Sequence, residues 1–219
     1  MSVRRGHSLT AALARENAGR LAAIISALPD TSTIDAMRGF EGAAARAYFK
    51  VLGALVRPDD PELMPCGRTR RPPRDPVNAL LSFFYGLLRT ECAGALEAVG
   101  LDPQVGFFHT LRPGRPSLAL DLMEELRPVL ADRLALTLVN RREVGGDDFV
   151  TSEGGAVHLS DPGRKKVITA YQEAKLRQIT HPLLREDVSA GLLPHVQARL
   201  LARFVRNDIP YYPPYLDGR

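Results

Sequence analysis

Length, composition and charge are those of an ordinary globular protein. The chain has 219 residues, 45% hydrophobic and 25% charged, which suits one domain with a sizeable core. No apolar run reaches membrane length, and no hydrophobic signal-peptide region follows the N-terminal MSVRR. Cys66 and Cys92 have neither metal-site nor redox spacing, so we expect reduced thiols in a cytoplasmic protein with no membrane partner. The formal net charge of +4, carried mostly by arginine, permits an anionic partner.

The first part of the chain predicts two helices. Residues 8–28 carry a periodic apolar face and end before a proline. Residues 38–56 follow and contain Gly39 and Gly42 within a run of small residues. Each glycine destabilises a helix by roughly 1 kcal/mol relative to alanine, so we expect a neighbour to pack closely there. Glu41 lies between the two glycines and is either a site residue or a surface carboxylate paired with a nearby arginine.

A basic loop over residues 57–75 precedes the strongest helix of the sequence. Guanidinium groups on such a loop suit phosphate binding, although Arg/Pro linkers that only contact solvent are common. The arginines are Arg68, Arg70, Arg71 and Arg74. Asp75 can cap a helix over residues 76–100, which is apolar almost all round and is therefore predicted to be the central core helix. Tyr85 is one of its few polar side chains, and such a tyrosine usually serves packing.

Residues 106–127 hold the most suggestive arrangement of side chains. His109 precedes a basic loop and then a helix that Ser117 can cap. The arginines of this loop are Arg112 and Arg115. Asp121 and Glu124 lie three residues apart on one helical face, and their apolar neighbours predict that this face is half-buried. Like charges repel there unless a cation or proton compensates. A solvated acidic stripe with a structural histidine fits the same residues.

The rest of the chain predicts more helix and one small sheet. Helices are expected over residues 129–139, 161–179 and 183–206, and a β-hairpin over residues 147–159. The final PYYPPYL is expected to be extended, and its tyrosines either stack on bases or cover the core. The predicted fold class is therefore mainly α, with one small hairpin.

Acids and one imidazole on three separate segments can assemble a metal site. Glu41, His109 and Glu124 offer two carboxylates and a ring nitrogen, a set that suits Mg²⁺ or Mn²⁺, and the imidazole favours Mn²⁺. Such an ion stabilises charge on phosphoryl oxygens, and the arginine loops would hold the flanking phosphates. The implied chemistry is phosphodiester cleavage or transfer on DNA. The sequence has no P-loop, no dinucleotide fingerprint, no HExxH and no GxSxG.

Four stretches resemble the CRISPR-associated integrase family, the "Cas one" endonucleases of spacer acquisition. They read RGFEGAAARAYF, GRTRRPPRDPVNALLSFFYGLL, EAVGLDPQVGFFHTLRPGRPSLALDLMEELRP and NDIPYYPPYL. The resemblance implies that Glu41, His109 and Glu124 bind the metal and that Asp121 lies beside it and supports catalysis. Tyr85 matches a family tyrosine near the active site.

The resemblance also implies a reaction and partners. Family members join a DNA 3′-OH to a repeat-end phosphodiester by metal-dependent attack, and they nick branched DNA. They work as homodimers with a small companion protein, "Cas two". The resemblance covers the family's helical catalytic domain, here residues 1–219, and the chain starts without the family's N-terminal β-domain, which supplies much of the family's homodimer interface. Two alternatives remain: a catalytically impaired DNA-binding module, and a basic helical interaction protein whose acids are structural.

Overall fold

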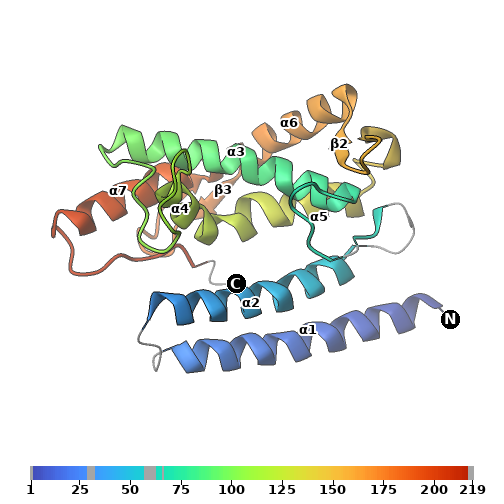
Figure 1. Cartoon of the computed structure of the whole chain (residues 1–219), viewed down its shortest axis with the longest axis horizontal. Helices are drawn as coiled ribbons and strands as arrows, with labels where there is room; N and C mark the ends of the chain where they lie inside the picture. Colours follow the sequence, from blue (N-terminus) through green and yellow to red (C-terminus); the bar gives the residue numbers. More distant parts are fainter. Residues whose placement is uncertain (1, 29–32, 57–62, 66, 217–219) are drawn as a thin grey trace.

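The computed structural model describes residues 2–28, 33–56, 63–65 and 67–216, with only the backbone for residues 2–11. Two long helices, α1 (Ser2–Ala27) and α2 (Ile34–Ala54), run antiparallel along one side of the molecule (Figure 1). The Thr33 hydroxyl caps α2 by accepting a hydrogen bond from the backbone N–H of Ala36. The C-terminal part of α2 and the residues after it pack into the main core through the buried side chains of Phe49, Leu52 and Val56.

The two glycines that flank Glu41 on α2 do not serve the close packing that the sequence predicts, although Ala45 of the same stretch packs against the core. An added Cβ would meet no described atom within 4 Å at Gly39, and at Gly42 only the Arg46 guanidinium at 3.8 Å. The expectation of a tightly packed neighbour at these glycines is therefore wrong for the described residues. Their effect is to leave open space on both sides of Glu41, which is itself exposed.

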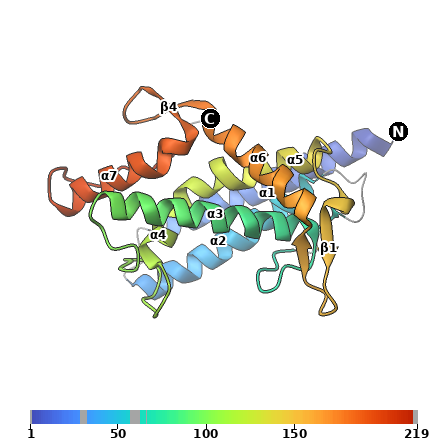
Figure 2. The same ribbon diagram turned by 90° about the horizontal axis from the view of Figure 1, so that it is seen from above.

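The central element is α3 (Pro76–Ala98), as predicted. The Asp75 carboxylate caps it by accepting from the backbone N–H of Asn78 at 2.8 Å, and Pro76 occupies the first turn. Past its end, Gly100 has a φ of +80°, a left-handed conformation that glycine adopts without strain. Figure 2 shows α3 crossing the molecule with the other helices arranged around it.

Helix α4 (Ser117–Arg127) packs on α3 and continues into α5 (Arg133–Asn140). Between them lies a π-helical turn, η3 (Pro128–Asp132). Pro128 has no N–H for a helical hydrogen bond, so the chain widens by one residue there instead of ending. The sequence predicted that Pro128 would kink or end the helix, and the structure shows this local distortion.

After α5, the described part of the chain forms two β-hairpins and two helices. The first hairpin pairs β1 (Phe149–Thr151) with β2 (Val157–Leu159) inside the predicted range of 147–159. The other elements are 3-10 turns η4 (Gly146–Asp148) and η5 (Ala190–Leu192), helices α6 (Asp161–Leu176) and α7 (Leu193–Val205), and strands β3 (Gln178–Thr180) and β4 (Asp187–Ser189).

The β3–β4 hairpin corrects the predicted fold, which had only one hairpin and helix over residues 161–179 and 183–206. Strands of three residues are too short to show an alternating pattern. The turn is closed by tertiary detail, including a backbone hydrogen bond from His181 to Glu186 at 2.8 Å and a φ of 57° at Arg185. In the part of the chain that the structure describes, no helix is long and apolar enough to cross a membrane.

The extended tail covers the core rather than standing free. Glu125, on α4, accepts hydrogen bonds from the Tyr212 hydroxyl, from the backbone N–H of Tyr215 at 2.6 Å and from Gln197 at 3.2 Å. Tyr215 is buried, whereas Tyr211 is 63% exposed. Of the two roles considered for the tail tyrosines, covering the core therefore describes Tyr212 and Tyr215.

A buried carboxylate joins three elements of the main core. Asp132, in η3, is 1% exposed and accepts hydrogen bonds from the hydroxyls of Tyr48 on α2, at 2.6 Å, and Tyr85 on α3. Burial raises the pKa of Asp132, and the two hydroxyls act in the opposite direction by stabilising the charged form. The network therefore fixes α2 and α3 against the turn that follows α4.

Replacing Tyr48 by phenylalanine tests this network. Tyr48→Phe keeps the ring but removes one hydrogen bond to a buried carboxylate, so we expect the free energy of unfolding to fall by about 1.5–3 kcal/mol. Urea unfolding followed by circular dichroism measures the change. Tyr211→Phe, at an exposed position, is the matched control and should change stability by less than about 0.5 kcal/mol. Equal effects of the two substitutions would contradict the role given to Asp132.

Candidate functional site

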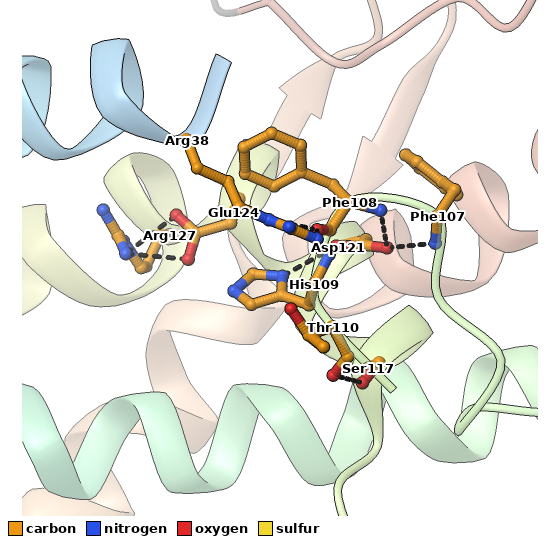
Figure 3. Close-up of polar contacts among 9 residues, drawn as sticks. All are labelled: Arg38, Phe107, Phe108, His109, Thr110, Ser117, Asp121, Glu124 and Arg127. Atoms are coloured by element: carbon orange, nitrogen blue, oxygen red, sulfur yellow. Dashed lines mark hydrogen bonds and ion pairs between the residues drawn. The ribbon is translucent and has the colours of Figure 1, made fainter. Parts of the chain in front are cut away.

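One carboxylate organises the loop that leads into α4 (Figure 3). Asp121 accepts hydrogen bonds from the backbone N–H groups of Phe107, Phe108 and His109 at 2.8, 3.1 and 2.9 Å. It also bonds the Nδ1 of His109 at 2.7 Å, and its side chain is 1% exposed. Burial opposes ionisation, but these hydrogen bonds outweigh it, so the pKa of Asp121 lies below its ordinary value.

Gly106 is required where this loop approaches α4. A Cβ built there would lie 2.7 Å from the backbone carbon of Ser117 and 2.8 Å from Oδ2 of Asp121, which is closer than atoms pack. The absence of a side chain therefore lets the loop reach the carboxylate. Sequence reasoning did not single out Gly106, although its place in the GFFH stretch was a usable signal.

Ser117 does not cap α4, contrary to the sequence-based prediction. It is the first helical residue, and its hydroxyl donates to the carbonyl of Thr110 at 3.0 Å. The carbonyl of Pro103 instead accepts from the N–H groups of Leu118 and Ala119 at 2.8 and 3.1 Å, which satisfies the first turn from a distant loop. Ser117 thus helps to fasten the loop to the helix.

The bond to Asp121 determines how His109 is presented. Because the ionised Asp121 can only accept, Nδ1 of His109 donates to it, and Nε2 is the ring nitrogen left for another partner. The ring is 21% exposed, and Figure 3 shows Nε2 on the side away from Asp121. An imidazole held by a carboxylate in this way is the usual arrangement of a metal-binding histidine. Asp121 therefore positions His109.

Glu124 follows Asp121 by three residues on α4, and its carboxylate points toward Arg127 rather than toward the His109 loop (Figure 3). Nη1 of Arg127 lies 3.0 Å from Oε1 and 2.8 Å from Oε2 of Glu124. Burial raises the pKa of Glu124, Arg127 lowers it, Glu41 raises it further, and His109 and Arg70 lower it. The predicted metal ligands therefore lie near enough to act on one another electrostatically.

The three predicted ligands are gathered in one region but are not arranged as a preformed metal cluster. Among the described residues, no group of three or more histidine, cysteine or acidic side chains is placed to hold an ion. Glu41 lies on α2, where it lines a cavity of about 830 Å³ together with Arg68 and Arg70. Glu124 lies on α4, and His109 lies on the loop that precedes α4.

The predicted DNA-binding arginines have different environments. Arg68 is used inside the fold, where it donates to the Thr69 carbonyl at 2.6 Å and to Oδ1 of Asn78 at 2.7 Å. Arg74 donates to the Gly154 carbonyl at 2.5 Å, which joins the basic loop to the β1–β2 hairpin. Four of the predicted arginines, Arg70, Arg71, Arg74 and Arg112, are exposed to solvent, whereas Arg68 and Arg115 are half-buried.

Tyr85 is linked to the site by Arg127, which lies over its ring and pairs with Glu124. Its hydroxyl donates to Asp132, and the guanidinium carbons of Arg68 and Arg127 lie 5.4 and 5.1 Å from its ring centre. Burial is the main reason why the pKa of Tyr85 is raised, and the neighbouring Asp132 raises it further. The hydroxyl is therefore a hydrogen-bond donor to Asp132 in this structure, and the ring supports two arginines.

Two further contacts were not foreseen from the sequence. Arg38 of α2 donates to the carbonyl of Phe108 at 3.1 Å from Nε and 2.6 Å from Nη2, and it also pairs with Asp35 at 2.7 Å. It thereby fastens the His109 loop to α2. Arg127 was also missed, although its spacing of three residues after Glu124 on a helix was a usable signal.

Comparison with known proteins finds related sequences over most of this chain. The family model described as CRISPR associated protein Cas1 matches residues 2–173. The CRISPR-associated endonuclease Cas1 2 of Rhodospirillum rubrum is 57% identical over 83% of this chain and 53% of its own length. A Cas1 endonuclease of Moorella thermoacetica is 52% identical over 92% of this chain and 59% of its own length. The chain thus spans little more than half the length of these relatives.

Solved structures give the same answer for the fold. A Cas1 protein from Thermotoga maritima matches with a TM-score of 0.78 and 26% identity, over 95% of this chain and 67% of that chain. A casposase bound to integration product matches with a TM-score of 0.80 and 25% identity, over 90% of this chain and 56% of that chain. The match of the family model to most of the sequence, together with these identities, shows that the chain belongs to the CRISPR associated protein Cas1 family.

Proposed function

We propose that residues 1–219 form a single helical catalytic domain of a metal-dependent DNA endonuclease and integrase of CRISPR spacer acquisition. Its reaction is attack of a DNA 3′-OH on a phosphodiester, a transesterification that inserts a spacer into the repeat array. The observation that carries the proposal is the hydrogen bond between Asp121 and Nδ1 of His109, which leaves Nε2 on the side of the ring away from Asp121 (Figure 3), while Glu124 follows Asp121 by three residues on the same helix. Relatives at 57% and 52% identity are named Cas1 endonucleases, which supports this reading.

The donor set fits a divalent ion. Glu41 and Glu124 supply carboxylate oxygens and His109 supplies a neutral ring nitrogen, a combination that suits Mn²⁺ or Mg²⁺. Burial is the main reason why the pKa of Glu124 is raised, and the charge of Glu41 adds to it, so a cation that binds at this carboxylate would favour its ionised form. A divalent ion bound there would stabilise charge on a phosphoryl oxygen and on the attacking or leaving oxygen.

Arginines that reach solvent supply a path for DNA, and of these Arg115 is half-buried. Arg70 and Arg71 on the basic loop, and Arg112 and Arg115 on the loop between His109 and α4, lie in chain segments that flank the proposed ligands. Such side chains bind phosphate oxygens by charge-assisted hydrogen bonds and read little sequence. Branched DNA, such as a prespacer on its repeat, is the proposed substrate. The likeness to a casposase bound to integration product supports it. The "Cas two" companion and homodimer formation are proposed from the family resemblance.

The first test removes the proposed nitrogen ligand. His109→Ala should reduce divalent-dependent nicking of branched DNA by about a hundredfold or more, because metal catalysis contributes several kcal/mol and each ~1.4 kcal/mol is tenfold in rate. DNA affinity in the same preparation should stay within about twofold. His195→Ala, at an exposed position on α7, is the control. An active His109→Ala protein would disprove the site. A parent that binds DNA without nicking it would favour the DNA-binding module instead.

The second test addresses the positioning of the loop. In Asp121→Asn, a side-chain NH2 group, which can only donate, replaces one of the two oxygens that accept from the backbone N–H groups. We therefore expect the free energy of unfolding at pH 7 to fall by about 2 kcal/mol or more. Because the folded pKa of Asp121 is lowered, its contribution is present above the ordinary value of about 4 and is lost as pH falls through the folded value.

The difference in stability between parent and Asp121→Asn should therefore narrow between pH 7 and pH 3. Chemical denaturation at a series of pH values measures it. Asp147→Asn, at an exposed aspartate, provides the control and should show a small difference at every pH. A gap that is constant or widens toward low pH would mean that Asp121 is not held ionised by the loop.

The third test concerns the DNA path. Binding should weaken steeply with salt, because each phosphate contact releases counterions and contributes about 0.9 to the slope of log K against log salt. Substituting both Arg70 and Arg71 by alanine should reduce that slope by up to ~1.8. Arg141→Ala, at an arginine with a 73% exposed side chain, should leave it unchanged. Fluorescence anisotropy with labelled branched DNA gives the slopes, and identical slopes would remove the basic loop from the path.

A further inference from the structure

A single arginine already occupies the carboxylate that is proposed to bind metal. One nitrogen, Nη1 of Arg127, bridges both oxygens of Glu124 at 3.0 and 2.8 Å. The side chain of Arg127 is 12% exposed and that of Glu124 is 34% exposed, so the pair is partly shielded from solvent. A cation in this position compensates the carboxylate in the same way as a metal ion would, with a single positive charge.

The structure also fixes Arg127 where it is. Its guanidinium carbon lies 5.1 Å from the ring centre of Tyr85 and 5.7 Å from that of Phe49, so aromatic faces from α3 and α2 hold the group. Its Nε is buried and has no hydrogen-bond partner. The guanidinium group is therefore held by its contacts with two rings. Among the described residues, the ion pair of Arg127 is with Glu124.

These contacts set up a competition for Glu124. An ion that coordinates Glu124 needs at least one of the oxygens that Nη1 now shares, so it must weaken an existing contact in a partly buried setting. Glu41 adds negative charge to the same region, which favours the arrival of a cation. Arg127 balances that charge before the ion arrives and holds the carboxylate in one orientation.

We propose that Arg127 is a positioning residue that holds Glu124 in the metal-free protein and lowers its affinity for a divalent ion. The proposal rests on the metal site of the proposed function. Tyr85 supports this role, because the guanidinium group of Arg127 lies over its ring. Arg127 acts through Glu124 in this arrangement, and a merely structural ion pair would affect folding without altering metal affinity.

The experiment measures Mn²⁺ binding without DNA, by isothermal titration calorimetry and by the rise in melting temperature that Mn²⁺ causes. Arg127→Gln removes the competing charge, so we expect about tenfold tighter Mn²⁺ binding, a lower melting temperature without metal and a larger rise with it. Arg127→Lys restores a cation and should bind Mn²⁺ with an affinity between those of the parent and Arg127→Gln. Arg141→Gln, at an exposed arginine, should match the parent.

The outcomes separate the two proposals. If the parent binds Mn²⁺, Glu124→Gln does not, and Arg127→Gln binds with unchanged or weaker affinity, the metal site stands and the role of Arg127 is wrong. If Arg127→Gln only lowers the melting temperature, the ion pair is structural and the proposal is overturned. If neither the parent nor Arg127→Gln binds Mn²⁺, the metal site itself fails, and the role of Arg127 fails with it.

Discussion

The arrangement of the site depends on one buried carboxylate. Asp121 is a short side chain on a regular helix, yet it accepts three backbone N–H groups and an imidazole N–H from residues 12 to 14 positions earlier. Leaving such donors unpaired would cost about 1–3 kcal/mol each, so the loop has one favourable path along α4. That path needs Gly106, because any side chain there would collide with the helix. The orientation of His109 is a consequence of this packing.

A second set of charges joins the site to the core. Arg68 and Arg127 both lie over the rings of Phe49 and Tyr85, at 5.1 to 5.7 Å, and Tyr85 in turn donates to Asp132. Buried cations and carboxylates are costly unless each has a partner. Pairing them through two aromatic rings connects α2, α3 and α4, so the segments that carry the proposed ligands are held by the same contacts that hold the core.

The sequence was informative where one residue type has one local role. Asp75 as a helix cap and the apolar α3 were confirmed, because capping and burial follow from nearby residues. It was uninformative where the same residue type has two roles. Asp121 and Glu124 look like one acidic pair, but Asp121 turns toward the His109 loop and Glu124 toward Arg127. Likewise, Arg68 reads as a basic-loop arginine, and only the fold shows that Asn78 and two rings surround it.

The absence of a preformed three-ligand cluster among the described residues follows from the same electrostatics. Two carboxylates that faced one point without a cation would repel one another in a setting of low dielectric. Each proposed ligand is instead satisfied separately: His109 by Asp121, Glu124 by Arg127, and Glu41 by solvent on the open side of α2. The glycines beside Glu41 keep that side open. A cation that binds Glu124 would therefore compete with one ion-pair contact, whereas Glu41 offers an exposed carboxylate.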